Sequence, residues 1–334
     1  AEHWATSSAF ARIGYSFKNK YILETNFRYD GSSRFPSDER WAFFPSASVG
    51  WRISQEPWWN VKSEHISNAK VRFSWGSLGN AAGLSNYQYI QTLGISKSDY
   101  ILDGLRQNYM SSPAALPGNL TWETATTYDI GADLGFFDNR LTVSGDYYIR
   151  KTTDMIVNGP TVPDVFGASS PKGNYADMST YGYELSLEWR DGFDLAGKRF
   201  NYSIKGTLAD YYSVIDRFNN ANKSLSEYAN QSLDKNYYEG MRIGEIWGFV
   251  SNGLWQDSID AAEAAAKAAG QSYYNPLMQT SKTYKLYPGD IKFEDLNGNG
   301  YIDRGQNTVD DPGDRKIIGN KNPSCRFSFN NTLT

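Results

Sequence analysis

Apolar and polar residues alternate with a period of two along most of this sequence. From Ala9 to Phe17 every second residue is apolar, whereas Arg12, Gly14 and Ser16 lie between them. This pattern indicates antiparallel strands with two unlike faces, and helical periodicity is nearly absent. We therefore predict an all-β fold. The alternation predicts nine strands, at about 9–17, 21–30, 43–53, 69–77, 122–136, 141–151, 179–190, 199–212 and 324–333.

The connections between these strands distinguish two kinds of sheet. Soluble antiparallel sheets also have one apolar and one polar face. The predicted connections, however, are about 3, 12, 15, 44, 4, 27, 8 and 111 residues long, alternating short and long except at the third. Membrane barrels have this rhythm because their periplasmic turns are short and their extracellular loops long. It favours an antiparallel transmembrane β-barrel segment in a Gram-negative outer membrane, in contact with lipid.

Composition agrees with a barrel and excludes other classes. Mean hydropathy is −0.58, so no helical membrane protein is indicated, but barrel strands need only about ten alternating residues. The 24 Tyr and 10 Trp suit aromatic girdles. A formal net charge of −4 without a basic block argues against nucleic acid as a partner. The single cysteine, Cys325, cannot form an internal disulfide.

The predicted strand count bears on domain organisation. Single-chain bacterial barrels have even numbers of strands, so nine strands indicate part of a larger barrel. Residues 1–334 are expected to belong to one barrel domain, with 213–323 as a long extracellular insertion. Within it, 257–269 is alanine-rich and predicts a short helix that ends at Gly270. The sequence starts without a signal peptide, as expected after processing or truncation.

The most specific local motif is an Asp-rich loop at 295–303. It matches the first nine positions of an EF-hand calcium loop. Oxygen ligands would come from Asp295, Asn297, Asn299, the carbonyl of Tyr301, and Asp303. At the twelfth position Gln306 replaces the bidentate glutamate, and Asp310, Asp311 or Asp314 could substitute. The alternative is a loop of Asx turns that needs no metal. A structural calcium ion is the only cofactor that the sequence suggests.

Enzyme signatures are sparse, and we predict no catalytic activity. The two histidines, His3 and His65, provide little material for a triad or a zinc site. The carboxylate pairs Asp129 with Asp133 and Glu184 with Glu188 fall on polar strand faces, as in a solvated lumen wall. Aromatic residues of the loops could stack on substrate or pack against one another, so substrate-binding residues stay unassigned. They are Tyr237, Tyr238, Trp247, Trp255, Tyr273 and Tyr274.

Several segments in a consistent order resemble one known family. They include Phe27–Phe35 (FRYDGSSRF), Lys70–Asn80 (KVRFSWGSLGN), Phe136–Leu141 (FFDNRL) and Asp314–Asn320 (DRKIIGN). Together with Leu120–Thr124 (LTWET) and Pro288–Phe293 (PGDIKF), they resemble the SusC/RagA family of TonB-dependent outer-membrane transporters of Bacteroidetes. The resemblance covers nearly the whole sequence but only the middle to late barrel. The family's plug domain and final barrel strands have no counterpart here.

This resemblance implies a roughly 22-stranded barrel with a plugged lumen. It also implies TonB-energised import of oligosaccharides or peptides with a SusD-like surface lipoprotein. Polar residues such as Glu24, Asp133 and Glu184 would then line the lumen and the apolar rows would meet lipid. On this hypothesis, Leu134→Arg should cost about 2–4 kcal/mol if Leu134 lies near mid-membrane. The alternatives are a secreted all-β carbohydrate-active enzyme or glycan-binding module, and a structural barrel without transport.

Overall fold

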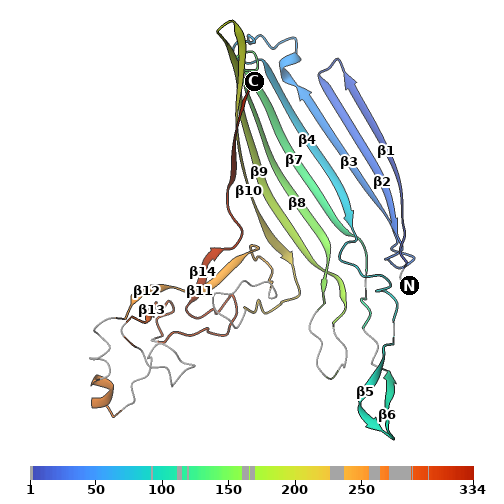
Figure 1. Cartoon of the computed structure of the whole chain (residues 1–334), viewed down its shortest axis with the longest axis vertical. Helices are drawn as coiled ribbons and strands as arrows, with labels where there is room; N and C mark the ends of the chain where they lie inside the picture. Colours follow the sequence, from blue (N-terminus) through green and yellow to red (C-terminus); the bar gives the residue numbers. More distant parts are fainter. Residues whose placement is uncertain are drawn as a thin grey trace. The chain divides into compact units, whose positions relative to one another are not determined.

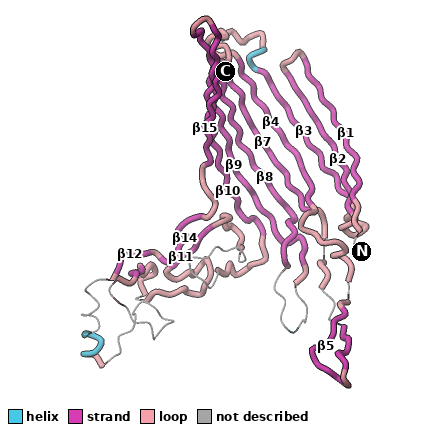
Figure 2. The backbone as a smooth tube through the Cα atoms, in the orientation of Figure 1, coloured by secondary structure: helices cyan, strands magenta, loops and turns pink. Residues whose placement is uncertain are grey.

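A nine-stranded antiparallel sheet forms most of the chain (Figures 1 and 2). The computed structural model describes residues 3–334 except 92, 111–114, 119, 160–164, 166–169, 226–236, 256–263, 271–286, 288 and 300. In spatial order the strands are β1 (Thr6–Phe17), β2 (Tyr21–Ser32), β3 (Trp41–Arg52), β4 (Asn68–Asn80), β7 (Glu123–Phe136), β8 (Leu141–Asn158), β9 (Lys172–Leu195), β10 (Lys198–Arg217) and β15 (Arg326–Leu333). The predicted all-β fold with nine barrel strands is confirmed.

Three small two-stranded sheets lie in the long connections. They are β5 (Ile95–Leu102) with β6 (Leu105–Met110), β11 (Glu245–Phe249) with β14 (Arg315–Asn320), and β12 (Ser251–Leu254) with β13 (Ile291–Phe293). A 3-10 helix, η1 (Ile53–Gln55), follows β3. None of the helices in the described ranges is long and apolar enough to cross a membrane.

The chain divides into two compact units. One contains Ala1–Asn219 with Ser324–Thr334 and therefore the large sheet. The other is Asn220–Pro323, to which we refer as the insertion. Of the predicted helix 257–269, residues 264–268 are helical, and 257–263 lie outside the described residues. Gly270 has a φ of +70°, which suits its predicted place at the helix end.

Short turns join the strands at one edge of the sheet. The connections there are 18–20, 53–67, 137–140 and 196–197, whereas 33–40, 81–122, 159–171 and 218–325 leave the opposite edge. In the two-residue turn, Ala196 and Gly197 have φ values of +51° and +76°, as a type I′ hairpin turn requires. By the rule for membrane barrels, the edge with short turns is periplasmic.

Strands β8, β9 and β10 extend further toward the long connections than the alternation predicts. The pairing of β8 with β9 shifts register between Thr152 and Met155, and that of β10 with β9 shifts between Ile215 and Arg217. An extra residue in a strand reverses the phase of a period-two pattern. In β8 the alternation therefore ends at Lys151, beside the first shift, although the strand continues to Asn158.

Little apolar surface is buried within the sheet itself, which is one layer thick. The apolar cluster of buried residues in this unit consists of Phe35, Leu84 and Leu120, at the edge with long connections. The ring of Trp122 packs on Phe35, with centroids 4.7 Å apart. This cluster joins the connections 33–40 and 81–122 at their bases. The described part of β1 and of β15 pairs with only one neighbouring strand each, so the sheet is open.

Candidate functional site: the barrel wall and the bases of its loops

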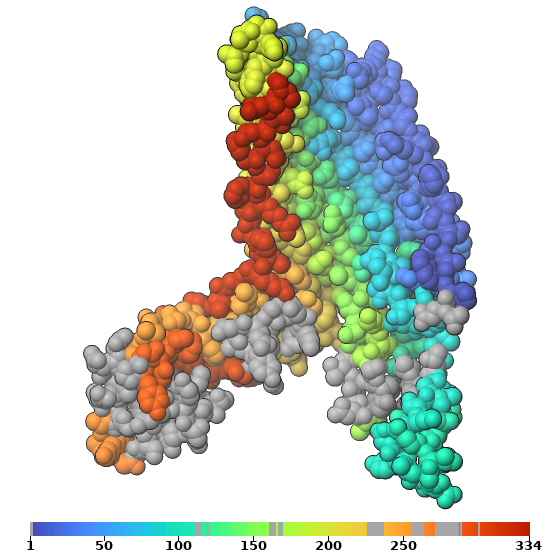
Figure 3. Space-filling model, viewed as in Figure 1, coloured from blue at the N-terminus to red at the C-terminus, as the bar shows by residue number. Residues whose placement is uncertain are grey.

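One face of the sheet presents apolar side chains in register across neighbouring strands. Six residues, each 42–60% exposed, form one continuous cross-strand row: Leu23, Val49, Phe73, Ile130, Tyr147 and Tyr183. Figure 3 shows the strands packed side by side as a wall. A contiguous apolar surface of this kind is unfavourable in water but suits the hydrocarbon of a bilayer. We refer to it as the lipid face.

Aromatic residues bound the lipid face at two levels. On β2, Tyr21 pairs with Trp51 near the short turns, and Tyr29 stacks on Trp41 at 5.1 Å near the long connections. The eight-residue step between Tyr21 and Tyr29 spans about 26 Å along a strand. Tilted by about 40°, it matches an apolar band roughly 20–25 Å tall. These residues therefore mark the two membrane interfaces.

Leu134 does not lie at mid-membrane. It pairs with Ala69 and Val143, two residues before β7 ends at Phe136, and is thus close to the periplasmic rim. Ile130, four residues further from the rim along β7, lies nearer the middle of the band and is 60% exposed. The substitution that tests the lipid face belongs at Ile130, because the depth of a residue depends on strand tilt and register.

The opposite, polar face is braced by Arg72 on β4. Its guanidinium donates to both carboxylate oxygens of Asp146 at 2.5 and 2.8 Å and to Asp133 at 3.1 Å. Asp133 also accepts a hydrogen bond from the Ser144 hydroxyl at 2.7 Å. This network joins β4, β7 and β8. Asp133 is thus occupied by structural partners, which leaves it unsuited to the acid or base role considered for the Asp129 and Asp133 pair.

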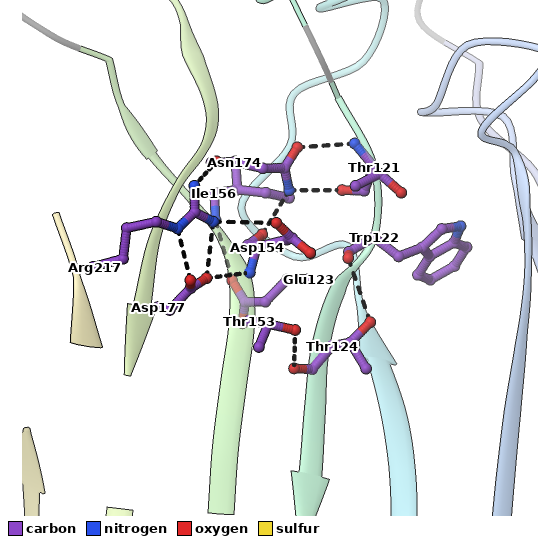
Figure 4. Close-up of polar contacts among 10 residues, drawn as sticks. All are labelled: Thr121, Trp122, Glu123, Thr124, Thr153, Asp154, Ile156, Asn174, Asp177 and Arg217. Carbon is purple, nitrogen blue, oxygen red and sulfur yellow. Dashed lines mark hydrogen bonds and ion pairs between the residues drawn. The ribbon is translucent and has the colours of Figure 1, made fainter. Parts of the chain in front are cut away.

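A second polar network lies where the long connections leave the sheet (Figure 4). The side-chain oxygen of Asn174 accepts from the backbone N–H of Thr121 at 2.8 Å. Its amide nitrogen donates to the carbonyl of Thr121 at 2.9 Å and to the carbonyl of Asp154. Arg217 donates to both oxygens of Asp177 at 2.6 and 2.9 Å and to Asp154 at 3.2 Å. The network therefore connects the bases of three long connections.

Figure 4 also shows how the backbone of β8 enters this network. Asp154 has a φ of +55° and donates its N–H to Asp177 at 2.8 Å. Glu123, at the start of β7, accepts from the N–H of Ile156 at 3.3 Å and from Asn80 at 3.0 Å. Asn174 and Arg217 were not predicted from the sequence. No motif signals them, because their partners come from four different segments.

The insertion has buried polar groups of its own. Tyr238 donates a hydrogen bond to Glu245 at 2.5 Å, and burial together with this carboxylate raises the pKa of Tyr238. Burial lowers the pKa of the Arg315 guanidinium. Tyr238 and Trp247 are both buried, so these two loop aromatics pack in the interior of the insertion. Tyr273 and Tyr274 lie outside the described residues.

The Asp-rich loop is held together by hydrogen bonds to backbone N–H groups. Asn297 accepts from Asn299 and Asn299 accepts from Tyr301, each as an Asx turn does, and Asp295 accepts from Gly298, three residues on, at 2.7 Å. The Asn299 amide donates to Asp303 at 2.7 Å. The structure thus brings the five predicted ligand residues into one loop.

Asp314, which could have replaced the missing glutamate, has another role. It is fully buried, and its carboxylate accepts from the N–H groups of Leu296 at 2.7 Å, Asn297 at 3.3 Å and Asp303 at 2.8 Å. In the part of the chain that the structure describes, no three His, Cys, Asp or Glu residues form a metal-binding group. A calcium site would need amide and carbonyl oxygens beside the carboxylates of Asp295 and Asp303, and it stays a prediction.

Comparison with known proteins identifies the family to which the sheet belongs. Residues 3–322 match the family model described as TonB dependent receptor-like, beta-barrel. The chain belongs to the TonB-dependent receptor family.

Two TonB-dependent receptors illustrate the similarity. Receptor P3 of Formosa agariphila is 31% identical over 331 residues, covering 98% of this chain and 30% of that protein. Receptor SusC of Bacteroides thetaiotaomicron is 29% identical over 307 residues, covering 90% of this chain and 28% of that protein. The chain thus spans about 30% of the length of the receptors that it matches.

Two solved structures share the fold. The structure of the RagAB peptide transporter covers 75% of this chain at 23% identity with a TM-score of 0.61, and 26% of that chain is covered. The RagAB peptide importer in the closed-closed state covers 98% of this chain at 20% identity with a TM-score of 0.67, and 32% of that chain is covered. At these identities the likeness concerns the fold alone.

These findings place this TonB-dependent receptor segment in the outer membrane and confirm the resemblance to the SusC/RagA family. The prediction that the chain is not an enzyme agrees with its similarity to receptors. The alternative of a secreted carbohydrate-active enzyme is therefore wrong.

Proposed function

We propose that this chain forms part of the barrel wall of an importer that takes up oligosaccharides or peptides through the outer membrane. The observation that supports this most strongly is the contrast between the two faces of one sheet. The lipid face meets hydrocarbon, and the opposite face carries Arg72 with Asp133 and Asp146. A polar interior wall lets a hydrated solute pass.

The partners in this proposal follow from the family. TonB would supply energy from the inner membrane, through a part of the protein outside this sequence. A SusD-like surface lipoprotein would capture the substrate at the long connections. Of the two substrate classes, peptide is suggested by the name of the RagAB peptide transporter, whose fold this chain shares. Oligosaccharide follows only from the resemblance to the SusC/RagA family.

Uptake by cells that carry the full-length protein tests the role of the polar face. Ser48 lies on the polar face of β3, and its neighbour Ala47 lies on the lipid face, opposite Thr25 and Trp75. We expect Ser48→Trp to slow growth on the imported nutrient, whereas Ala47→Trp serves as the matched control and leaves growth near wild type. Equal growth of both variants would show that the polar face of β3 does not line the route.

Substrate and partner are tested separately. A strain that lacks the full-length protein should lose growth on either defined oligosaccharides or a peptide mixture, and deletion of tonB should have the same effect. Purification of the tagged protein from native membranes should recover a lipoprotein in stoichiometric amount. Growth that is independent of tonB contradicts active import, whereas absence of a lipoprotein contradicts only the two-component part.

A further inference from the structure

The connection 53–67 is the exception to the short turns at the periplasmic edge, because it is 15 residues long. It contains the adjacent tryptophans Trp58 and Trp59, and Trp58 is 59% exposed. The segment begins with η1 and continues through a tight turn in which the backbone N–H of Trp59 donates to the backbone carbonyl of Glu56 at 3.0 Å.

Hydrogen bonds fix this segment on the lipid side of the wall. The carboxylate of Glu56 accepts from the hydroxyl of Tyr21 at 2.7 Å and from the indole N–H of Trp51 at 2.9 Å. Tyr21 and Trp51 are paired residues of the lipid face. Lys20 forms an ion pair with the same carboxylate at 3.2 Å, and the Glu56 side chain is only 8% exposed.

The tryptophans continue the aromatic boundary beyond the last strand residue. The ring of Trp58 contacts that of Trp51 edge to face with centroids 6.4 Å apart, and the ring centroids of Trp58 and Trp59 are 6.2 Å apart. Tryptophan has an apolar ring with one polar N–H, and it concentrates at membrane interfaces because both parts are accommodated there. Further along, Lys62 and Glu64 have side chains 76% and 60% exposed, as in water.

We propose that residues 56–59 form an interfacial anchor that lays Trp58 into the headgroup region of the periplasmic leaflet. The occupant of this surface is phospholipid, because the surface is continuous with the lipid face through Tyr21 and Trp51. The anchor would fix the depth and tilt of β2 and β3 in the bilayer.

Spin labelling of the full-length protein tests this proposal. With Cys325 and any other cysteine replaced by serine, a nitroxide is attached to Trp58→Cys in phosphatidylethanolamine and phosphatidylglycerol bilayers. Val49→Cys on the lipid face provides the lipid reference, and Glu64→Cys in the same connection provides the aqueous reference. We expect the label at 58 to collide with oxygen as a lipid-exposed site does, and to be less accessible to a water-soluble nickel complex than the label at 64.

Two results of the spin-label experiment would overturn the proposal. Nickel accessibility equal to that at 64 would place Trp58 in water, and protection from both oxygen and nickel would place a protein over it. Because the label itself alters the site, quenching by lipids brominated near the glycerol backbone gives a second measurement. Replacement by Trp58→Phe should reduce the fraction of tryptophan fluorescence that these lipids quench, and an unchanged fraction would contradict the anchor.

Discussion

The sheet and the insertion Asn220–Pro323 differ in where they place apolar side chains. Along the sheet, residues such as Phe73 and Ile130 are exposed, and the strands are held by the backbone hydrogen-bond ladder. In the insertion, Leu225, Met241 and Ile302 are at most 3% exposed and form an interior. One chain thus follows two sets of rules, because one region is surrounded by hydrocarbon and the other by water.

Polar groups show the same contrast. In the insertion the buried carboxylate of Asp314 is satisfied by three backbone N–H groups and fixes a loop. On the polar face of the sheet, Arg72 and its two aspartates are about 20–30% exposed and brace three strands. Substitutions in each region should therefore affect that region and leave the other unchanged.

Asp314→Ala is expected to have the largest effect. A hydrogen bond to a charged group contributes about 1.5–3 kcal/mol, so the loss of three such bonds to the Asp314 carboxylate should destabilise the insertion by roughly 3 kcal/mol or more. Limited proteolysis of the full-length protein should show faster cleavage within 220–323, while the barrel keeps its heat-modifiable migration on gels. Asp310→Ala, in the exposed part of the same segment, is the control. Unchanged cleavage would disprove the anchoring role of Asp314.

Ile130→Arg tests the opposite region. A charge near the bilayer midplane should destabilise the barrel by about 2–4 kcal/mol, and Leu134→Arg near the rim should cost clearly less, about 0–1 kcal/mol at the interface itself. Urea unfolding of the full-length protein in lipid vesicles measures both. Equal costs for the two variants would contradict the depth assigned to Ile130.

Asn174→Ala tests the network that connects the loop bases. It removes both hydrogen bonds to Thr121 and should lower local stability by about 1–2 kcal/mol. Hydrogen exchange should accelerate in peptides that cover 120–124. Thr153→Ala, which removes only a 3.5 Å contact to Thr124, should leave exchange there unchanged. If both variants behave alike, Asn174 does not hold this segment.

The Glu56 contact should depend on pH. Hydrogen bonds from Tyr21, Trp51 and Lys20 lower the pKa of Glu56. A lowered pKa in the folded state means that the stabilisation is fully present above the ordinary carboxyl pKa of about 4.3 and is lost as pH falls through the lowered value. Hydrogen exchange of 53–67, corrected for the intrinsic rate, should therefore increase in strong acid. Glu56→Gln should abolish that dependence, and its persistence would assign the dependence to another group.

Calcium is expected to have the smallest effect. We propose that the loop 295–303 binds calcium weakly, because a glutamine replaces the bidentate glutamate. A weak ligand at a concentration near its Kd adds only about 0.4 kcal/mol. Calcium should slightly slow proteolysis of the insertion, EDTA should reverse this, and Asp295→Asn should remove the response. A response that survives in Asp295→Asn would place the ion elsewhere.

The sheet could be predicted from the sequence because each strand carries its own signal. Alternation from Tyr21 to Asp30 identifies both a strand and its two faces, and the tight turns set the hairpin partners. The polar face was also predicted, but its pairing was not. Arg72 and Asp133 meet across a connection of 81–122, and no local rule gives the register between β4 and β7.

The insertion was less predictable. Its strands β11–β14 are three to six residues long, too short for alternation to be recognised. Its Asp-rich loop was found by motif, yet Asp314 was assigned only as a spare ligand. Its role depends on burial, which follows from contacts between segments that are distant in the sequence.

The pairing of β11 with β14 has a consequence for how the barrel assembles. Strand β15 adds to β10 only after 218–325 has been synthesised, and bringing such distant segments together becomes less favourable as the intervening chain lengthens. Pairing of Glu245 with Asn320 closes most of that length. Once β11 and β14 have paired, only 218–244 and 321–325 remain to be closed between β10 and β15, in place of 218–325. Folding of the insertion outside the membrane would therefore speed the joining of strands within it.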